Sequence, residues 1–239
     1  MSQFTKGNSQ KGFLKIIIIG DSGVGKSSLI EAFNYKKISK SAKPTIGAEF
    51  SKKKLRLNET GIEVNLQLWD TAGQERFQSL CTSFYRGSDG CILVFDISSA
   101  ESYENLEKWR QIFVQTTGDD SRQIPIVLVG NKVDCVNTIH RDQIMQEWVK
   151  TGKAKDYIEA SALKNVGIEE IFQSVAQNAL DYQNSLKASI AEGFSHSIIN
   201  IRQITKSGSQ VGGAGAASRV STVGQRNGAG QRTRQNCQC

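Results

Sequence analysis

The chain has 239 residues, of which 38% are apolar, and a formal net charge of +7. This length suits one domain of ordinary size with additional segments, and the apolar content supports a packed core. No apolar run approaches the roughly 20 residues of a membrane-spanning helix, and the polar start of the chain lacks a signal-peptide core, so neither a span nor secretion is expected. Five cysteines in a chain of this kind and two distant histidines, His140 and His196, argue against a disulfide framework and a zinc site.

The first predicted elements are a strand, a glycine-rich loop and a helix. The run Ile16–Ile19 is typical of a buried strand, and good helix formers follow at Ser28–Phe33. Between them, Gly20-Asp-Ser-Gly-Val-Gly-Lys-Ser27 matches the phosphate-binding loop pattern in the context that this pattern needs. Glycines let backbone N–H groups face an anion, and the helix N-terminus adds partial positive charge. We expect Lys26 to reach the β- and γ-phosphates and Ser27 to place its hydroxyl on Mg²⁺. A chance glycine-rich turn is the alternative.

A β-hairpin is predicted next, with strands at 49–57 and 62–69 joined by a turn at 58–61. The strict alternation of residues 62–68 is typical of a half-buried strand, and the three consecutive lysines at 52–54 suit an exposed sheet edge.

Polar residues around the hairpin complete the predicted binding site for the phosphates and Mg²⁺. Asp70 follows the second strand and is expected near Mg²⁺, while Gly73 offers a backbone N–H to the γ-phosphate. Gln74 is placed to orient the attacking water, and Thr45 to supply a second hydroxyl to the metal. Taken singly, Thr45 is also consistent with a turn residue and Gln74 with a solvated helix start.

The second half of the predicted domain contains the motif that indicates which nucleotide base is bound. A buried strand is predicted at 90–95, a helix with one apolar face marked by Leu106, Trp109, Ile112 and Phe113 follows, and a second buried strand spans 124–130. Asn131-Lys-Val-Asp134 then lies on a strand-end loop. A carboxylate at Asp134 accepts two hydrogen bonds from guanine N1–H and its exocyclic amine, whereas adenine leaves it unpaired. An ordinary polar turn is the alternative for this motif in isolation.

The last predicted helix has an apolar face formed by Ile168, Ile171, Phe172, Val175 and Ala179. Residues 183–239 hold seven of the Lys and Arg residues and one Glu, and Gly, Ser, Gln and Arg dominate after Lys206. We therefore predict a flexible N-terminus at 1–12, a domain at 13–182 and a disordered basic tail at 183–239. A short amphipathic helix around 194–204 is an alternative. Attraction to an anionic membrane is favoured over nucleic-acid binding, because no aromatic follows Phe194.

With these motifs, the chain resembles the Rab branch of the Ras-like small GTPases. The resemblance is carried by the phosphate loop, Ile46-Gly-Ala-Glu-Phe50, Leu68-Trp-Asp-Thr-Ala-Gly-Gln-Glu-Arg-Phe77, Tyr85-Arg-Gly-Ser88 and the terminal Cys237-Gln-Cys239. It covers residues 13–182, and within the branch the chain is most similar to late-endosomal and lysosomal Rabs. The implied fold is α/β, a Ras-like P-loop domain. It has a six-stranded, mostly parallel sheet with one antiparallel edge strand and helices on both faces.

The resemblance implies a role for each matching residue. The phosphate-binding residues are Asp21, Ser22, Gly23, Val24, Gly25, Lys26, Ser27, Ser28, Thr45 and Gly73, and Mg²⁺ is held by Ser27, Thr45 and Asp70. Gln74 is the catalytic residue that positions water. Guanine is bound by Asn131, Lys132, Asp134, Ser161, Ala162 and Leu163. The effector surface comprises Ile46, Phe50, Trp69, Phe77 and Tyr85, of which the aromatics are alternatively core residues. Cys237 and Cys239 are the sites of geranylgeranylation.

Three positions depart from the family pattern. Ile38 lies where an aromatic usually covers the guanine face, which implies a loss of about 1 kcal/mol or more of stacking. Leu163 replaces the usual lysine of the loop Glu159-Ala-Ser-Ala-Leu163, and Ser22 stands where Ras has glycine. The first two departures bear on nucleotide affinity and exchange rate rather than on guanine specificity.

Together with the motifs, the resemblance implies a monomeric GTP/GDP switch that hydrolyses GTP slowly, with Mg²⁺ as cofactor, and that regulates vesicle traffic in the endosome–lysosome pathway. The expected partners are an exchange factor, an activating protein, effectors, a prenyl-Rab escort protein and a membrane, without nucleic acid. The expected location is the cytoplasmic face of a late endosome or lysosome, with a cytosolic pool. The alternatives are a membrane adaptor that no longer cycles nucleotide and a basic-tailed nucleic-acid-associated protein.

Overall fold

The computed structural model describes residues 12–38, 44–73, 82–118 and 124–207, with side chains described through residue 190. The predicted site residues Gln74, Phe77, Cys237 and Cys239 lie outside these ranges. The chain forms two units, Met1–Ala191 and Glu192–Cys239. The first unit contains the whole sheet.

The elements of the first unit alternate between strands and helices, as expected for an α/β domain. In chain order they are β1 (Leu14–Ile19), α1 (Lys26–Tyr35), β2 (Ala48–Arg56), β3 (Glu63–Thr71), β4 (Gly90–Asp96), α3 (Ala100–Glu104), α4 (Leu106–Thr117), β5 (Ile126–Asn131), α5 (Arg141–Ile144), the π-helical turn η2 (Met145–Val149), β6 (Asp156–Ala160) and α6 (Ile168–Ser207). The predicted hairpin, three of the strands and three of the helices occur where the sequence places them. The sequence analysis did not place α3, α5, η2 or β6.

The six strands form one sheet in the order β2-β3-β1-β4-β5-β6. Only β2 runs antiparallel to its neighbour, and it lies at an edge, which puts the three lysines 52–54 on an edge strand as predicted. The predicted fold class is therefore confirmed. Because five strands are parallel, their carboxyl ends share one edge of the sheet, where ligands bind in folds of this type.

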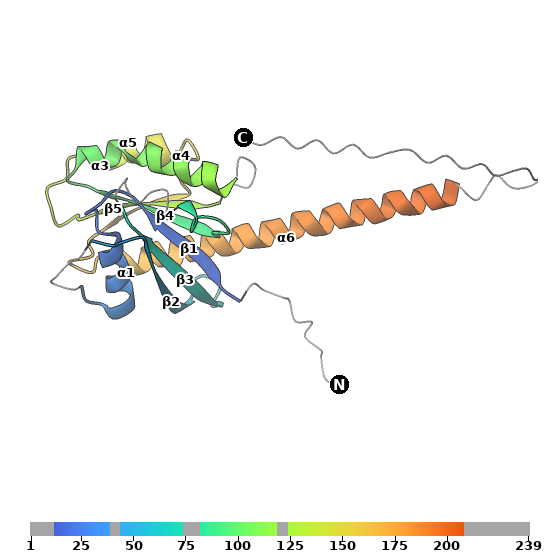
Figure 1. Ribbon diagram of the computed structural model, residues 1–239, viewed down its shortest axis with the longest axis horizontal. Helices are drawn as coiled ribbons and strands as arrows, with labels where there is room; N and C mark the ends of the chain where they lie inside the picture. Colours follow the sequence, from blue (N-terminus) through green and yellow to red (C-terminus); the bar gives the residue numbers. More distant parts are fainter. Residues whose placement is uncertain (1–11, 39–43, 74–81, 119–123, 208–239) are drawn as a thin grey trace, which may run out of the picture. The chain divides into compact units, whose positions relative to one another are not determined.

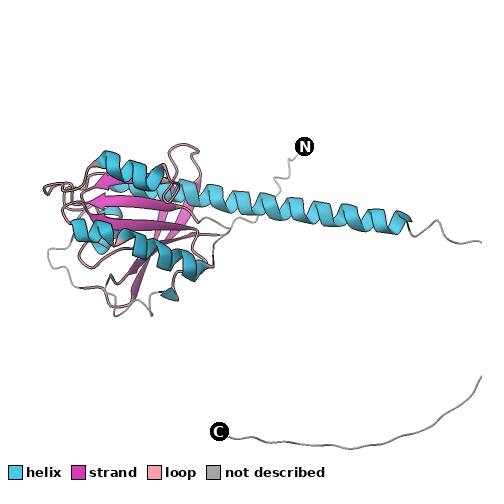
Figure 2. Ribbon diagram, turned by 90° about the horizontal axis from the view of Figure 1, so that it is seen from above, coloured by secondary structure: helices cyan, strands magenta, loops and turns pink. Residues whose placement is uncertain are grey.

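Helices cover both faces of this sheet (Figures 1 and 2). Successive residues of β1 point to opposite sides, so Ile16 and Ile18 belong to one apolar core and Ile17 to the other. The first core is closed by α1 and α6, whose Phe33 and Phe172 rings stack with centroids 3.9 Å apart. The second is closed by α4 and the α5–η2 segment. The central strands β1, β4 and β5 are thus buried on both faces, which explains their continuous apolar runs.

Helix α6 continues beyond the predicted domain end at 182 and reaches Ser207. Residues 183–207 are thus helical, which corrects the prediction of an irregular linker from 183. The physical reason lies in composition, because this stretch contains no proline and only one glycine, Gly193, while alanine, leucine and isoleucine recur. The alternative of a helix around 194–204 agrees with this. Among the described residues, every helix is too short or too polar to cross a membrane.

Candidate functional site

The predicted site residues converge at the carboxyl edge of the parallel strands. β1 leads into the glycine-rich loop, β3 carries Asp70 near its end, β5 ends at Asn131, and β6 is followed by Ser161. Because β3, β1, β4, β5 and β6 lie side by side in one parallel array, motifs that are far apart in sequence meet along this edge.

The glycine-rich loop wraps around the Lys26 side chain. Lys26 begins α1, is buried, and its Nζ donates to the carbonyl oxygens of Gly20 at 2.9 Å and Asp21 at 2.7 Å. A buried ammonium held against the loop gives the loop a fixed positive charge. Gly25 precedes α1 with a φ of 98°, a conformation that favours glycine. This arrangement suits an anion placed against the loop and the helix N-terminus.

The three predicted metal-binding side chains lie together beside this loop. Ser27 Oγ donates to Asp70 Oδ2 at 2.5 Å, Thr45 Oγ1 lies 3.0 Å from Ser27 Oγ, and Thr45 Oγ1 donates to Asp70 Oδ2 at 3.3 Å. Burial raises the pKa of Asp70, partly offset by the Ser27 hydrogen bond and the Lys26 charge. Among the described residues, no group donates to its buried second oxygen, Oδ1. The structure therefore brings together the three residues that the sequence predicted as metal ligands.

Gly73 closes against the phosphate loop. A Cβ at this position would lie 2.4 Å from the carbonyl carbon of Asp21 and 2.5 Å from Lys26 Nζ, so only glycine allows this approach. The predicted proximity of Gly73 to the phosphate loop is therefore present in the structure.

The Asp21 carboxylate is anchored by α4, which the sequence analysis missed. Asp21 Oδ1 accepts from Trp109 Nε1 at 2.7 Å, and Oδ2 accepts from the Asn105 side chain at 2.8 Å. The sequence analysis placed Trp109 on the apolar face of its helix, and its ring does pack in the core. The indole N–H of a buried tryptophan requires an acceptor, and this requirement was the available signal.

Asn131 connects the two halves of the site. Its side-chain amide donates to the Val24 carbonyl oxygen at 2.8 Å, and its Oδ1 accepts from the Ala162 N–H at 3.2 Å. Asn131 is buried, and a Cβ on Gly25 would lie only 2.3 Å from its amide nitrogen. The predicted guanine-binding residue thus uses both polar groups to join the phosphate loop to the loop after β6.

The remaining guanine-loop residues form a second connection. Ser161 Oγ donates to Asp134 Oδ1 and accepts from the Lys164 N–H at 3.0 Å. The Asp134 side chain is exposed, whereas Ser161 is buried. Leu163 is 62% exposed in the same loop, so its apolar side chain faces solvent where the family pattern has a lysine.

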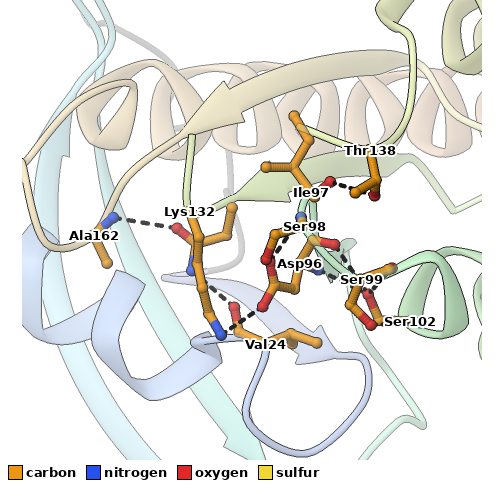
Figure 3. A network of polar contacts seen from close by, with 10 residues as sticks. Val24, Asp96, Ile97, Ser98, Ser99, Ser102, Lys132, Thr138 and Ala162 are labelled. Atoms are coloured by element: carbon orange, nitrogen blue, oxygen red, sulfur yellow. Dashed lines mark hydrogen bonds and ion pairs between the residues drawn. The ribbon is translucent and has the colours of Figure 1, made fainter. Parts of the chain in front are cut away.

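Lys132 makes an ion pair that the sequence analysis did not predict. Its Nζ lies 2.6 Å from Asp96 Oδ2 at the end of β4, within the polar network of Figure 3. Burial by itself would raise the pKa of Asp96, but hydrogen bonds from Lys132 and Ser98 outweigh it and hold the pKa below its usual value. Asp96 follows a buried strand at the carboxyl edge, as Asp70 does, so its position in sequence was a usable signal.

An open cavity of about 420 Å³ lies against the glycine-rich loop and reaches Lys132. Its walls come from Asp21–Val24 and Gly73 on one side, from Ser99 to Trp109 on another, and from Asp96 and Lys132. Ile38, the first departure from the family pattern, is half-buried and packs against the core that α1 and α6 close.

Only some of the residues of the predicted effector surface are exposed to solvent. Ile46 is 79% exposed and Phe50 is 44% exposed, while Trp69 is half-buried with its ring centroid 5.1 Å from that of Phe50. Tyr85 is fully buried and packs against Phe113 in the second core. This corrects the assignment of Tyr85 to an exposed surface and agrees with the alternative that its ring is a core residue.

Comparison with known proteins agrees with this geometry. The family model described as "Ras family" matches residues 15–181. The chain is 43% identical over 175 residues to Ras-related protein Rab7 of Drosophila melanogaster, covering 73% of this chain and 84% of that protein. It is 42% identical over 179 residues to Ras-related protein Rab-7a of Dictyostelium discoideum, covering 74% and 87%. It is 44% identical over 170 residues to the GTP-binding protein yptV5 of Volvox carteri, covering 70% and 82%.

Proposed function

The chain belongs to the Ras family and, within it, to the Rab7-like Rabs, and from this premise we propose which of its residues carry each part of a GTP-driven switch. As a Rab GTPase it hydrolyses GTP and acts in membrane traffic of endosomes and lysosomes. The observation that carries the proposal is the double contact of Asn131, which holds the phosphate loop and the guanine loop in one site.

At the phosphate end, Asp21–Ser28 surround the β- and γ-phosphates with backbone N–H groups while Lys26 supplies the charge. Lys26 is already confined by the Gly20 and Asp21 carbonyls, so little side-chain freedom is lost when a nucleotide binds. Gly73 is close enough to Asp21 and Lys26 for its N–H to meet a γ-phosphate seated at the loop. The Trp109 and Asn105 hydrogen bonds to Asp21 hold the start of the loop in place.

At the guanine end, Asp134 is the group that selects the base. Ser161 Oγ donates to one carboxylate oxygen, which fixes the rotamer of this exposed side chain and leaves it acceptor capacity for guanine donors. Ala162 and Leu163 contribute the loop beside the base, and Leu163 covers it with an aliphatic rather than a charged side chain. Lys132 covers the base and ribose with its stem while its ammonium pairs with Asp96.

The residues at the phosphate end also fit Mg²⁺. Two hydroxyls and a carboxylate are oxygen donors of the kind this ion prefers. The buried Asp70 Oδ1, to which no described residue donates, is an acceptor that a nearby cation or its water would satisfy. When bound, Mg²⁺ would neutralise charge on the β- and γ-phosphates. Ser27, Thr45 and Asp70 would hold it, and the charge would keep Asp70 ionised despite its burial.

Hydrolysis and switching depend on the segments around Thr45 and Gly73. Thr45 lies within hydrogen-bonding distance of Ser27 and Asp70, so the Thr45 hydroxyl would hold its segment to Mg²⁺ bound with a γ-phosphate. Gln74 follows Gly73 in sequence and would orient the attacking water. Ile46, Phe50 and the exposed part of Trp69 then present the GTP-dependent surface to effectors, with an exchange factor and an activating protein setting the timing.

Membrane attachment is assigned to the tail. Cys237 and Cys239 would each carry a geranylgeranyl group, because one lipid chain gives only marginal anchoring and two give stable anchoring. The basic residues of 183–239 would add attraction to an anionic leaflet. An escort protein that covers the two lipids would maintain a cytosolic pool beside the late-endosomal and lysosomal membrane.

A second candidate function is a membrane adaptor that no longer cycles nucleotide. It is favoured by Ile38, which packs on the core rather than lying free to cover a base, and by the exposed Leu163. Both changes weaken coverage of guanine rather than its recognition by Asp134.

The nucleotide carried by purified protein separates these possibilities. The protein is denatured and the supernatant is resolved by chromatography. Stoichiometric GDP or GTP is expected; empty protein or adenine nucleotide would contradict the switch. Gln74→Leu is then expected to slow single-turnover GTP hydrolysis without weakening GTP binding, and an unchanged rate in this variant would remove Gln74 from the catalytic role and favour the adaptor.

A further inference from the structure

A second pocket, of about 220 Å³, lies away from the nucleotide site between α4, the start of β5 and the segment that leads into β6. Its apolar part includes Phe113, Val114 and Ile126, and its charged part consists of Arg110, Lys153 and Lys155. No acidic side chain lines it among the described residues. This size suits a single phosphate group with its ester, rather than a whole nucleotide.

The pocket is at the opposite edge of the sheet from the nucleotide site. Ile126 lines the pocket at the start of β5, and Asn131 ends the same strand, so five residue steps of about 3.3 Å separate the two sites by roughly 17 Å. Leu180 and Gln183 of α6 line a small cavity with Leu14, at the start of β1. Because β1 and β5 are parallel, α6 reaches the same edge as the pocket at this point.

The charges around the pocket are incompletely balanced. Glu107 bridges two of the cations, with Arg110 Nη2 at 2.8 Å from one carboxylate oxygen and Lys153 Nζ at 3.2 Å from the other. The Arg110 hydrogen bond lowers the pKa of Glu107 to about 2, so this carboxylate is ionised and shared. Lys155 forms no ion pair within the described part of the chain. Among the described residues around the pocket, three cations therefore face one carboxylate, which leaves an excess of two positive charges.

Among the described residues, the acid next to Lys155 in the sequence does not cancel this excess. Asp156 follows Lys155, but its carboxylate accepts hydrogen bonds from Ser174 and Asn178 of α6, on the other side of the sheet. Asp119, Asp120 and Arg122 stand in sequence between the two segments that line the pocket and lie outside the described residues.

We propose that this pocket binds a phosphate-bearing anion, with Lys153 and Lys155 as its main contacts and Arg110 beside them. An ammonium group attracts phosphate oxygens as a point charge, and the buried and half-buried apolar side chains of the pocket reduce solvent screening of that attraction. A phospholipid headgroup and a free phosphate ester present the same chemistry. The proposal concerns the domain itself, so its failure would leave the GTP switch and the lipidated tail untouched.

The test uses the full, unlipidated chain loaded with GDP and Mg²⁺, so that the nucleotide site is filled. ¹⁵N NMR follows the amides of Gly152, Lys153 and Lys155 while inorganic phosphate or a water-soluble, short-chain phosphatidylinositol monophosphate is added. Saturable shifts at these amides are expected, distinct from any shifts in residues 183–239 that report binding to the tail. Lys153→Ala with Lys155→Ala should weaken binding by about fivefold for each charge removed.

Lys54→Ala is the matched control, because Lys54 is an exposed lysine on the edge strand β2. Binding by this variant should equal that of the unmodified chain. Equal saturation by inorganic phosphate and by the short-chain lipid supports a free phosphate ester, whereas tighter binding of the lipid supports a membrane headgroup. Absence of shifts with both probes, or shifts that persist in the double variant, overturns the proposal. If the double variant does not fold, Lys155→Gln is tested with the same NMR readout and should also weaken binding.

Discussion

Removal of the Asn131 side chain tests whether this residue holds the two halves of the nucleotide site together. Asn131→Ala deletes the hydrogen bonds to the Val24 carbonyl at 2.8 Å and from the Ala162 N–H at 3.2 Å. Val24 is 2% exposed and Ala162 is 7% exposed, so both backbone groups are left buried without a partner. Each such group costs about 1–3 kcal/mol, and the free energy of unfolding should fall by about 2–6 kcal/mol.

Bound nucleotide complicates this measurement, because any ligand of the folded state adds apparent stability. Urea unfolding should therefore be followed at several GDP concentrations with constant Mg²⁺. The dependence on GDP concentration reports affinity, and the value extrapolated to zero GDP reports the domain itself. For Asn131→Ala we expect the extrapolated value to fall and the affinity to weaken as well, since the phosphate loop and the guanine loop are no longer joined.

Asn58→Ala is the control, since Asn58 is exposed in the turn between β2 and β3 and the substitution is chemically the same. Its effect should stay within about 0.5 kcal/mol. If Asn131→Ala costs less than about 1 kcal/mol at zero GDP, the two contacts do not stabilise the site and the reasoning is refuted.

Three further outcomes are expected. In Gly73→Ala the new Cβ would lie 2.4 Å from the Asp21 carbonyl carbon, and the displacement of about 1 Å that relieves this contact should slow single-turnover GTP hydrolysis about a hundredfold; an unchanged rate would exclude the close approach in the GTP-bound state. Burial raises the pKa of Asp70 above its ordinary 3.8, so the metal-free domain loses stability as pH rises from 3.8 through that raised pKa. Asp70→Asn should therefore raise the free energy of unfolding in EDTA at pH 7 but not at pH 3, while weakening GDP binding in Mg²⁺; equal stability of both proteins at pH 7 would contradict this. Cys237→Ser with Cys239→Ser should leave the protein in the soluble fraction of cells, and continued membrane retention would show that the anchor lies elsewhere.

Much of the fold was accessible from local patterns. The strands of a doubly covered sheet are apolar along their whole length, so 16–19, 90–95 and 124–130 were recognisable without any contact information. Strand β6 was not placed, because Asp156–Ala160 is only five residues long and includes two acids. Helix α6 was cut at 182, since the apolar periodicity weakens there although helix-compatible residues continue to Ser207.

The residues of the site likewise fall into a group that local patterns predicted and a group that they did not. Residues whose chemistry depends on a short motif, such as Lys26, Ser27 and Asp134, were predicted from spacing and context. Residues that act through distant partners were not, because Asp21 meets Trp109 across 88 positions and Lys132 meets Asp96 across 36. For Tyr85, the motif match predicted an exposed effector residue, but its ring is buried in the core, which a motif match does not reveal.

The sequence by itself determined the family, the phosphate loop, the guanine motif and the alternation of elements, because each depends on residues close together in the chain. Only the tertiary structure decided that Asn131 joins two loops and that the side chains of Ser27, Thr45 and Asp70 contact one another. It also decided that Arg110, Lys153 and Lys155 line one pocket. These depend on the order of strands in the sheet, which brings distant segments within hydrogen-bonding distance and decides which charges are buried or balanced.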